Sequence, residues 1–332
     1  MTKNYALATI VLLAISPSLL AQTQNALDFD GIDDQVIVSG ASTHIAGSAA
    51  MSMTAWVYPR NSVNAFPDLD GYAGFRNEVD ADFYLVQIYN DVLEGRFRNS
   101  AGVAFTATTT TGLSLNTWHS VGLVYDGATL AIWVDGSVAA STAANGMITS
   151  TTADFTIGNI NYNTQPFWLD GKMDEIALWR RALNATEMEC LSAMPPNSGD
   201  PDLALYFSCD QGTPGGDNTA IPSLTDLSAS AANGTFSNIA LTGAGSNFVQ
   251  GTVFGTQVSD EICPGGSYSF NGQTLTAPGV YTASISTGGL CDSTVVLTLT
   301  QTVVNTNVAQ NQNLLISQAG GAGYQWINCA TN

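Results

Sequence analysis

Basic residues are scarce in this sequence. It has 8 Lys and Arg against 27 Asp and Glu, which gives a formal net charge of −19 at pH 7. After Lys3, every basic residue lies between Arg60 and Arg181, and residues 182–332 contain none. Proteins that bind nucleic acid neutralise phosphates with clustered Lys and Arg. The sequence therefore excludes a nucleic-acid partner, and its acidity favours either solubility by self-repulsion or the binding of cations by carboxylates.

Histidine and catalytic motifs are also missing. His44 and His119 are the only histidines, and neither lies near a cysteine. No cysteine belongs to a CxxC pair, so a zinc site has almost no ligands. No GxSxG motif or Cys–His arrangement accompanies a histidine, and no Lys follows a glycine run as in a phosphate loop. We therefore expect no catalytic residue, and no cofactor other than a cation.

Long apolar runs are absent except near the N-terminus. Lys3 precedes an apolar run from Ala6 to Leu20, and the small Ala21 follows. This pattern predicts a signal peptide over residues 1–21. A Ser-Pro-Ser sequence breaks the run, which is shorter than the roughly 20 apolar residues that span a bilayer. We expect a secreted or cell-surface protein whose mature chain has no membrane span.

Short strand patterns fill residues 26–183. Segments such as MSMTAWVYP, FYLVQIYN and HSVGLVYDGATLAIWVDG are separated by Gly and Asp-Gly turn signals. In TLAIWVDG, Leu130, Ile132 and Val134 fall on one face of a strand. One short helix is predicted after Asn184, where Glu187 completes a capping arrangement. The sequence predicts an all-β fold of the sandwich type.

Five of these segments occur in a characteristic order: DFDGIDDQVIV, AWVYP, TWHSVGLVYDG, FTIGN and GKMDEIALWRRALNATEM. Together they resemble the LamG-like jelly-roll domain of the concanavalin A-like lectin and glucanase superfamily, over most of residues 26–192. The stretch that follows resembles a segment that accompanies such domains in bacterial surface proteins. We therefore predict one LamG-like domain over residues 22–250, with a concanavalin A-like β-sandwich.

The sequence pattern of the chain changes after Val249. CPGGSYSFNGQTLTAPGVYTASISTGGLCDSTVVLTLT resembles the immunoglobulin-like repeats of exported bacterial surface proteins. We predict an immunoglobulin-like β module over residues 251–303. Residues 304–332 are expected to begin a further β module, because so short a segment is too small to bury a core. The chain is expected to be a fragment of a longer protein.

The stretch RNEVDADFYL places Glu78, Asp80 and Asp82 at alternate positions, which share one face if the segment is a strand. Glucanases of the superfamily carry a Glu-x-Asp-x-Glu strand whose outer acids are the nucleophile and the acid/base. The resemblance therefore offers a β-glucan hydrolase using Glu78 and Asp82 as an alternative. Asp82 is one methylene shorter than Glu, which widens the gap of about 5 to 5.5 Å that a retaining mechanism needs. We predict that these acids are not catalytic.

Two interpretations of the acidic stretch remain. The acids could pair with Arg76, Arg96 or Arg98 at a solvated strand edge, where each exposed pair is worth about 0.2 to 1 kcal/mol. Alternatively, they could line a ligand site together with nearby aromatic residues that can stack on a sugar ring. The predicted ligand-binding residues are Tyr72, Phe75, Glu78, Asp80, Asp82, Tyr84, Arg96 and Trp168.

A second acidic group, DFDGIDDQ, contains Asp30, Asp33 and Asp34. The resemblance places this first strand beside the closing strand that contains Asp174. Calcium takes six to eight oxygen ligands, and Gly31 permits a tight turn around an ion. We predict a calcium site formed by these four aspartates. The alternative is a turn in which the Asp side chains accept hydrogen bonds from backbone amides, while Asp174 pairs with Arg180 or Arg181.

Disulfides are the default interpretation of cysteines in an exported chain. We predict two local bridges, one joining Cys190 to Cys209 and the other joining Cys263 to Cys291. Each would stabilise its module by roughly 3 to 4 kcal/mol. Cys329 is left without a predicted partner.

The sequence thus predicts an exported binding or adhesion protein. Its LamG-like domain is expected to bind an extracellular carbohydrate or a surface protein, with a structural calcium ion. The alternatives are the hydrolase described above and a purely structural adhesin segment.

Overall fold

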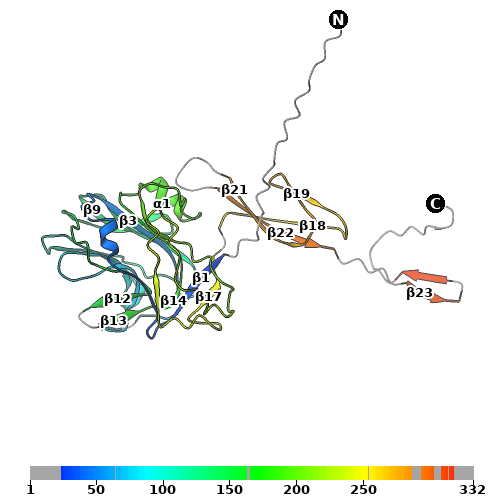
Figure 1. The fold of residues 1–332 in the computed structure, drawn as a ribbon, viewed down its shortest axis with the longest axis horizontal. Helices are drawn as coiled ribbons and strands as arrows, with labels where there is room; N and C mark the ends of the chain where they lie inside the picture. Colours follow the sequence, from blue (N-terminus) through cyan, green and yellow to red (C-terminus); the bar gives the residue numbers. More distant parts are fainter. Residues whose placement is uncertain are drawn as a thin grey trace, which may run out of the picture. The chain divides into compact units, whose positions relative to one another are not determined.

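The computed structural model of the protein describes residues 24–63, 65–162, 165–252, 254–285, 293–302, 308–312 and 314–317. These residues form an almost entirely β structure, so the predicted all-β fold class is confirmed. They belong to two compact units, and the larger one includes residues 24–256 (Figure 1). The predicted signal peptide, Cys291 and Cys329 lie outside the described residues. The domain boundaries stay predictions.

The larger unit contains two antiparallel sheets. In the first, the strand order is β10 (Ser137–Ala143), β9 (Thr129–Val134), β8 (His119–Tyr125), β3 (Met51–Pro59), β14 (Asp170–Trp179), β1 (Asn25–Asp30) and β17 (Phe248–Gln250). An eighth strand, β15 (Leu203–Phe207), also pairs with β14. In the second sheet, the order is β16 (Thr235–Ser237), β2 (Gln35–Val38), β11 (Phe155–Ile157), β4 (Asp70–Phe75), β5 (Asp82–Gln87), β6 (Leu93–Arg98) and β7 (Ala104–Thr108).

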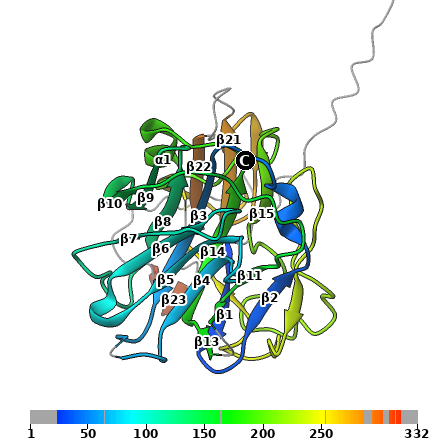
Figure 2. The same ribbon diagram turned by 90° about the vertical axis from the view of Figure 1, so that its left-hand side faces the viewer.

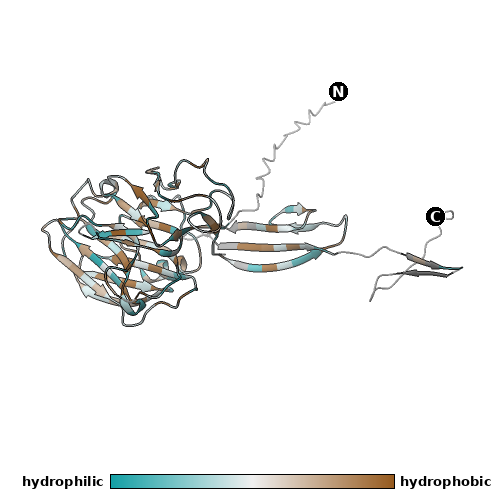
Figure 3. Ribbon diagram, turned by 90° about the horizontal axis from the view of Figure 1, so that it is seen from below, coloured by the Kyte–Doolittle hydropathy of each residue, from teal (hydrophilic) through white to brown (hydrophobic). Residues whose placement is uncertain are grey.

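The two sheets lie face to face, with β4, β5 and β6 in front of β3, β8 and β14 in Figure 2. Apolar and polar residues alternate along their strands (Figure 3), because successive side chains point to opposite faces. The core between the sheets holds Phe29 from β1, Phe83 from β5 and Leu123 from β8, all at 0% exposure. Burying one such side chain is worth about 1.5 to 3 kcal/mol. This packing confirms the predicted β-sandwich.

A separate hairpin lies over the outer face of the second sheet. It consists of β12 (Asn159–Tyr162) and β13 (Gln165–Trp168). Gly71 of β4 permits this close approach, because a Cβ atom there would lie 2.4 Å from the Ile160 nitrogen. Ile160 and Phe167 of the hairpin pack with Tyr84 and Val86 of β5 in a second apolar cluster. The second sheet is therefore apolar on part of both faces.

Short helical segments complete the larger unit. They are η1 (Ala41–His44), η2 (Tyr89–Asp91) and α1 (Ala185–Leu191). Asn184 caps α1 by accepting a hydrogen bond from the Glu187 amide, and the Glu187 side chain accepts one from the Asn184 amide in return. This reciprocal pair confirms the capping arrangement expected from the sequence.

The remaining described strands follow residue 255. Three of them form the sheet β18 (Thr256–Ile262), β22 (Ser293–Gln301) and β21 (Gly279–Ile285). Two hairpins also occur, β19 (Tyr268–Phe270) with β20 (Gln273–Leu275), and β23 (Val308–Asn311) with β24 (Leu314–Ser317). Ile262, Leu275, Leu297 and Leu299 form a small apolar cluster. The described residues of the range 251–303 are thus β-rich, and the immunoglobulin-like assignment stays a prediction.

Within the part of the chain that the structure describes, no helix is long and apolar enough to cross a bilayer.

Candidate functional site

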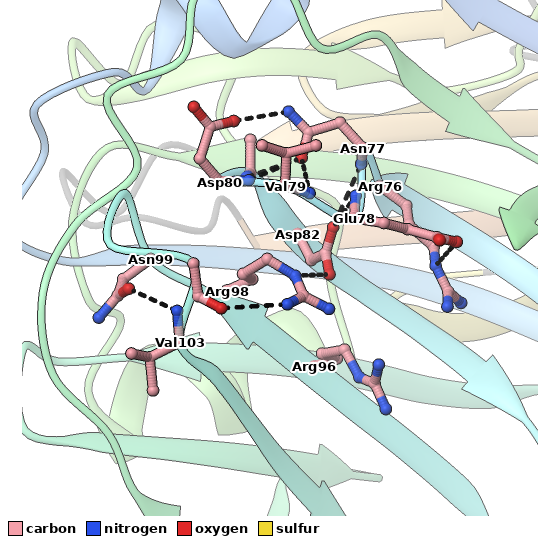
Figure 4. A network of polar contacts seen from close by, with 12 residues as sticks. Arg76, Asn77, Glu78, Val79, Asp80, Asp82, Arg96, Arg98, Asn99 and Val103 are labelled. Carbon is pink, nitrogen blue, oxygen red and sulfur yellow. Dashed lines mark hydrogen bonds and ion pairs between the residues drawn. The ribbon is translucent and has the colours of Figure 1, made fainter. Parts of the chain in front are cut away.

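The acidic stretch RNEVDADFYL is a turn followed by a strand, so the predicted row of acids on one strand face is wrong. β4 ends at Phe75 and β5 begins only at Asp82. Between them, the Asn77 side chain accepts hydrogen bonds from the amides of Val79, Asp80 and Ala81 at 2.9 to 3.1 Å (Figure 4). An amide side chain that accepts three backbone N–H groups stabilises a tight turn at the expense of a strand. Glu78 has a φ of 62°, in the left-handed region.

Asp82 has a structural role in this turn. Its side chain is fully buried, and its Oδ2 accepts a hydrogen bond from the Arg98 Nε at 2.7 Å. Its Oδ1 accepts hydrogen bonds from the amides of Asn77 and Glu78 (Figure 4). The Asp80 carboxylate accepts a hydrogen bond from the Asn77 side-chain amide, and Glu78 forms an ion pair with Arg76 at 3.1 Å. Asp82 is therefore held by Arg98 and two backbone amides, and Glu78 by Arg76.

Two of the predicted ligand-binding aromatics belong to the core. Tyr72 is 1% exposed, and its hydroxyl donates to Gln87 Oε1 at 2.5 Å. Phe75 is 0% exposed and packs edge to face against Phe155. The prediction of a ligand role was wrong for both, because they lie on the face of β4 that points into the sandwich. Tyr84 lies on the opposite, outer face of the second sheet.

A groove of about 460 Å³ opens on this outer face. We call it the aromatic groove, and it is lined by Phe66, Leu69, Arg76, Tyr84, Val86, Ile88, Tyr89, Glu94, Arg96, Tyr162 and Phe167. Of the predicted ligand residues, the structure places Tyr84 and Arg96 here. The sequence analysis missed the rest, although the alternation of Tyr84, Val86 and Ile88 is a signal for an apolar outer face.

The groove combines aromatic rings with two guanidinium groups. The Arg76 guanidinium lies 4.9 Å from the ring centre of Tyr84 and 4.4 Å from that of Tyr162. A nitrogen of the Arg96 guanidinium lies 3.5 Å from a Glu94 carboxylate oxygen, while the buried Arg96 Nε has no hydrogen-bond partner among the described residues. Burial raises the pKa of the Tyr84 phenol, so this hydroxyl stays protonated at neutral pH. Phe66 and Tyr89 remain 53% and 52% exposed, so their rings are available for stacking.

The predicted calcium ligands do not all come together. The carboxylates of Asp30, Asp33 and Asp34, which we call the acidic turn, lie within 4.8 Å of one another. Asp174 is not among them, because the register of β1 and β14 places Asp170 opposite Asp30, and Asp174 lies further along β14. The inclusion of Asp174 in the site was therefore wrong.

Most of the acidic turn is satisfied by local hydrogen bonds. Asp34 is 1% exposed, and its oxygens accept from the Asp30 amide at 3.0 Å and from the Ser246 hydroxyl at 2.9 Å. Asp30 Oδ1 accepts from the Ile32 amide. Burial, together with the charge of Asp30, raises the pKa of Asp34 to about 6. These contacts are those of the alternative that the sequence left open, a hydrogen-bonded turn.

A second acidic feature lies beside this turn. It is a pocket of about 120 Å³, here called the acidic pocket, lined by Asp30, Gly31, Asn61, Ser62, Val63, Asp68, Asp70, Trp168 and Asp170. Trp168, predicted to stack on a ligand, lines this pocket and lies apart from the aromatic groove. Burial, together with the charges of Asp170 and Asp68, raises the pKa of Asp70 to about 7. Sequence reasoning missed Asp68, Asp70 and Asp170.

Asp174 and Glu175 form a buried acidic pair. They are 1% and 4% exposed, and Glu175 accepts a hydrogen bond from the Tyr206 hydroxyl at 2.5 Å. Burial raises the pKa of Asp174 well above its usual range, and the charge of Glu175 raises it further. Burial also raises the pKa of Glu175, although the Tyr206 hydrogen bond opposes this effect.

Neither predicted disulfide is present. Cys209 is a free, buried thiol that packs in the core between the sheets, whereas Cys190 packs on the different apolar cluster around α1. Cys263 is also free and exposed, so it is not bonded to Cys291. The separation of Cys190 and Cys209 into two clusters explains why a pairing based on spacing failed.

Residues 30–189 match the family model described as the concanavalin A-like lectin/glucanases superfamily. This part of the chain therefore carries a domain of that superfamily, as its resemblance to LamG-like domains predicted. The match does not extend to residues 251–303. No curated protein matches the chain in sequence.

Several solved structures have a similar fold. A Bacteroides ovatus protein assigned to carbohydrate binding is 19% identical, with a TM-score of 0.45, and the match covers 65% of this chain but only 59% of that protein. The SAP-like pentraxin of Limulus polyphemus is 14% identical over 52% of this chain and 84% of its own, with a TM-score of 0.41. The CBM40 of the Ruminococcus gnavus IT-sialidase, bound to α2,3-sialyllactose, is 12% identical over 50% of this chain and 96% of its own, with a TM-score of 0.42.

Proposed function

We propose that the protein is an exported binding protein whose aromatic groove holds a carbohydrate. The observation that carries this proposal is the juxtaposition in one groove of exposed aromatic rings with guanidinium groups. Sugar rings present apolar C–H faces that stack on aromatics, and hydroxyls that accept hydrogen bonds from arginine. The lectin/glucanase family of residues 30–189 supports the same function. A role in adhesion or on the cell surface follows if the chain is exported.

The groove is suited to a small number of sugar units. Its volume of about 460 Å³ lies in the range of ordinary ligand sites. Arg76 is held between rings and pairs with Glu78, so its position is fixed before a ligand arrives. The Arg96 Nε offers a donor that the described residues leave unpartnered. A ligand oxygen at Arg96 would satisfy this buried donor and so contribute to affinity.

The same geometry makes binding a better proposal than hydrolysis. Asp82, the acid/base of the hydrolase alternative, is 0% exposed and paired with Arg98. Glu94 is the one carboxylate among the groove residues, whereas a glycosidase uses a pair. We expect the purified protein to release no reducing sugar from a β-glucan.

A glycan array probed with the purified full chain tests the proposal. We expect binding to a subset of glycans, and about tenfold weaker binding by Tyr89→Ala, which corresponds to roughly 1.4 kcal/mol. Arg96→Gln should also weaken binding. Val138→Ala on β10, an exposed apolar residue elsewhere, and Arg180→Gln, which contacts backbone carbonyls away from the groove, are the matched controls.

Two results would overturn the proposal. Wild-type protein that binds no glycan would leave the purely structural adhesin, or a protein partner, as the better interpretation. Binding that Tyr89→Ala and Arg96→Gln leave unchanged would place the ligand outside the aromatic groove.

A further inference from the structure

Three polar side chains beside β8 and β9 form a chain of hydrogen bonds. The Ser114 hydroxyl lies 2.7 Å from His119 Nε2, and His119 Nδ1 lies 2.9 Å from Asp135 Oδ2. Because a carboxylate only accepts, Nδ1 carries the proton of the neutral imidazole, and Nε2 accepts from the Ser114 hydroxyl. A hydroxyl, an imidazole and a carboxylate in this order are the nucleophile, base and orienting group of acyl transfer.

The strand pairing brings the imidazole and the carboxylate together. His119 begins β8, and Asp135 directly follows β9, the antiparallel neighbour of β8. The Asp135 amide donates to the Ser120 carbonyl at 2.8 Å, and the Ser120 amide donates to Asp135 Oδ1 at 3.0 Å. The carboxylate is therefore held by the backbone at one oxygen, and its other oxygen faces His119.

Ser114 lies in the loop between β7 and β8, which is anchored on both sides of this residue. The Leu113 amide donates to the Asp91 carbonyl at 2.9 Å, and the Asn116 amide donates to the Pro59 carbonyl at 2.8 Å. Leu113 is also buried in the core between the sheets. These contacts fix the position of the hydroxyl, as a nucleophile requires.

The three side chains line a pocket of about 360 Å³, which we call the serine pocket. Its walls also include the apolar side chains of Leu113 and Val134 and the three consecutive threonines of residues 109–111. Ser114 is exposed, so a ligand can reach its hydroxyl. The volume lies near the lower end of the range for ligand sites, which suits a small molecule.

The surroundings favour the charges that develop in acyl transfer. The Ser114 carbonyl lies 3.2 Å from His119 Nε2 and accepts a hydrogen bond from this nitrogen once it is protonated. The hydrogen bond to Asp135 raises the pKa of His119 above its usual 6.5, although burial opposes this effect. The Ser114 amide has no hydrogen-bond partner among the described residues and is available to an oxyanion, which the amide of the nucleophile binds in serine hydrolases.

We propose that the serine pocket hydrolyses a carboxylic ester with a short acyl group, with Ser114 as the nucleophile and His119 as the general base. His119 Nε2 takes the Ser114 proton while Oγ forms a bond to the ester carbonyl carbon. His119 then gives this proton to the leaving alcohol oxygen as the ester C–O bond breaks. Asp135 is a positioning residue, because it holds the imidazole and bonds to no reacting atom.

Water completes the reaction. It gives a proton to His119 as its oxygen attacks the acyl carbon, and His119 returns this proton to Ser114 Oγ as the acyl–serine bond breaks. Ester and water thus become acid and alcohol, and no other reactant is consumed. An ester suits the site because an alcohol leaves more easily than an amine, and the Asp135 side chain is 53% exposed, which weakens its hold on the imidazole.

Missing sequence motifs led to the expectation of no catalytic residue, and these three residues belong to none of those motifs. The nucleophile comes from a loop, the base from the start of a strand and the positioning acid from a hairpin turn. Such a constellation is recognised by geometry and roles, because its order in the sequence differs between unrelated folds.

Two probes test the proposal on the purified full chain. A fluorophosphonate reacts covalently with activated serines, and we expect its label on Ser114 when the peptides are mapped by mass spectrometry. p-Nitrophenyl acetate is the short ester, and we expect steady release of p-nitrophenol. Surface imidazoles also cleave this ester slowly, so the label on Ser114 is the primary measurement.

Matched variants identify the residues that react. Ser114→Ala should lose the label and about a hundredfold in esterase rate, whereas Ser100→Ala, at an exposed serine in another turn, should keep both within about twofold. His119→Gln should also lose about a hundredfold, and His44→Gln is its control. Circular dichroism and urea unfolding confirm that each variant folds.

The pH profile tests the positioning residue. The esterase rate should rise with pH through the pKa of His119, because the neutral imidazole is the base. Asp135→Asn should lower the rate by about tenfold and move the midpoint of the profile to lower pH, because the imidazolium loses its carboxylate partner. A purely structural contact would leave the rate and this midpoint unchanged.

Three outcomes would overturn the proposal. Wild-type protein that takes no label on Ser114 would reduce the three side chains to a structural chain of hydrogen bonds. An esterase rate that Ser114→Ala or His119→Gln leaves unchanged would place the reaction elsewhere, and an unshifted profile in Asp135→Asn would remove Asp135 from the site. None of these results depends on glycan binding at the aromatic groove.

Discussion

Asp70 and Asp82 occupy equivalent positions, each as the first residue of a strand in the second sheet, yet they differ in what surrounds them. Asp82 is 0% exposed, and Arg98 together with two backbone amides satisfies both of its oxygens. Asp70 is nearly as buried, at 6%, but receives one backbone amide and faces other acids. Burial of a carboxylate therefore has two meanings. A carboxylate whose partners are present stabilises the fold, whereas burial without them raises the pKa of the carboxyl group, as at Asp70.

The largest effect is expected from a substitution of Asp82, the carboxylate whose oxygens are both hydrogen-bonded. Asp82→Asn should lower the free energy of unfolding by about 3 to 5 kcal/mol, because Arg98 would keep its charge in a largely buried position without a counterion. Asp70→Asn, measured in calcium-free buffer, should leave stability unchanged or raise it. Urea unfolding of both variants checks the difference. Equal losses in the two variants would show that Asp70 is paired as fully as Asp82.

A second prediction extends the comparison to the buried pair Asp174 and Glu175. Burial raises the pKa of both groups in the folded state above the unfolded values of 3.8 and 4.5. The folded protein therefore binds more protons than the unfolded chain once the pH exceeds about 4. Stability should be fully present below the unfolded pKa values and should fall as the pH rises toward the folded ones.

Glu175→Gln separates this pair from the other raised acids, Asp34, Asp70 and Asp210. The variant should flatten the decline in stability, by about 1.4 kcal/mol for each pKa unit that is removed. Glu189→Gln on the exposed side of α1 is the control. Urea unfolding across a pH series measures the slope, and parallel wild-type and Glu175→Gln curves would contradict the prediction.

The sandwich could be predicted from the sequence because its signals are local. Alternation such as Leu130, Ile132 and Val134 fixes which face is buried, and Asn184 with Glu187 is enough to place the start of α1. These features need no knowledge of which strands are neighbours. The family resemblance rested on the same local segments, and residues 30–189 confirm it.

The candidate sites could be predicted only in part, through Tyr84 and Arg96, because they depend on turn geometry and strand register. Alternating acids suggested a strand at Glu78, but the side chain of Asn77 forms three hydrogen bonds that favour a turn. The register of β1 and β14 puts Asp170 beside Asp30, four residues away from the aspartate that was expected. The aromatic groove joins Tyr84, Tyr162 and Phe167 from strands that are distant in sequence. No local sequence pattern predicts which residues of distant strands will lie in one groove.

The turn itself offers a third and smaller test. Asn77→Ala should destabilise the protein by about 1 to 2 kcal/mol, because three amides lose their acceptor and only the solvent-accessible ones recover it from water. The exposed Asn145→Ala is the control and should change stability little. If Asn77→Ala is as stable as wild type, the acids of this segment are free to adopt the extended arrangement that the structure excludes.

The smallest expected effect concerns the two histidines. One of them is hydrogen-bonded to a carboxylate and the other is not, and NMR can follow the titration of each. His119 Nδ1 lies 2.9 Å from Asp135 Oδ2, and this hydrogen bond raises the His119 pKa above 6.5. Burial lowers the His44 pKa below that value. Two imidazole titrations on opposite sides of 6.5 should therefore appear in a proton NMR pH series. Asp135→Asn should lower the His119 pKa and leave that of His44 in place; Asn tolerates the φ of 48° at this position.

Because the folded pKa of His119 is raised, its contribution to stability is present below pH 6.5 and is lost as the pH rises through the folded pKa. The contribution should be below about 1 kcal/mol, since Asp135 is exposed. Coincident titrations in wild type would mean that the contact with Asp135 does not persist in solution.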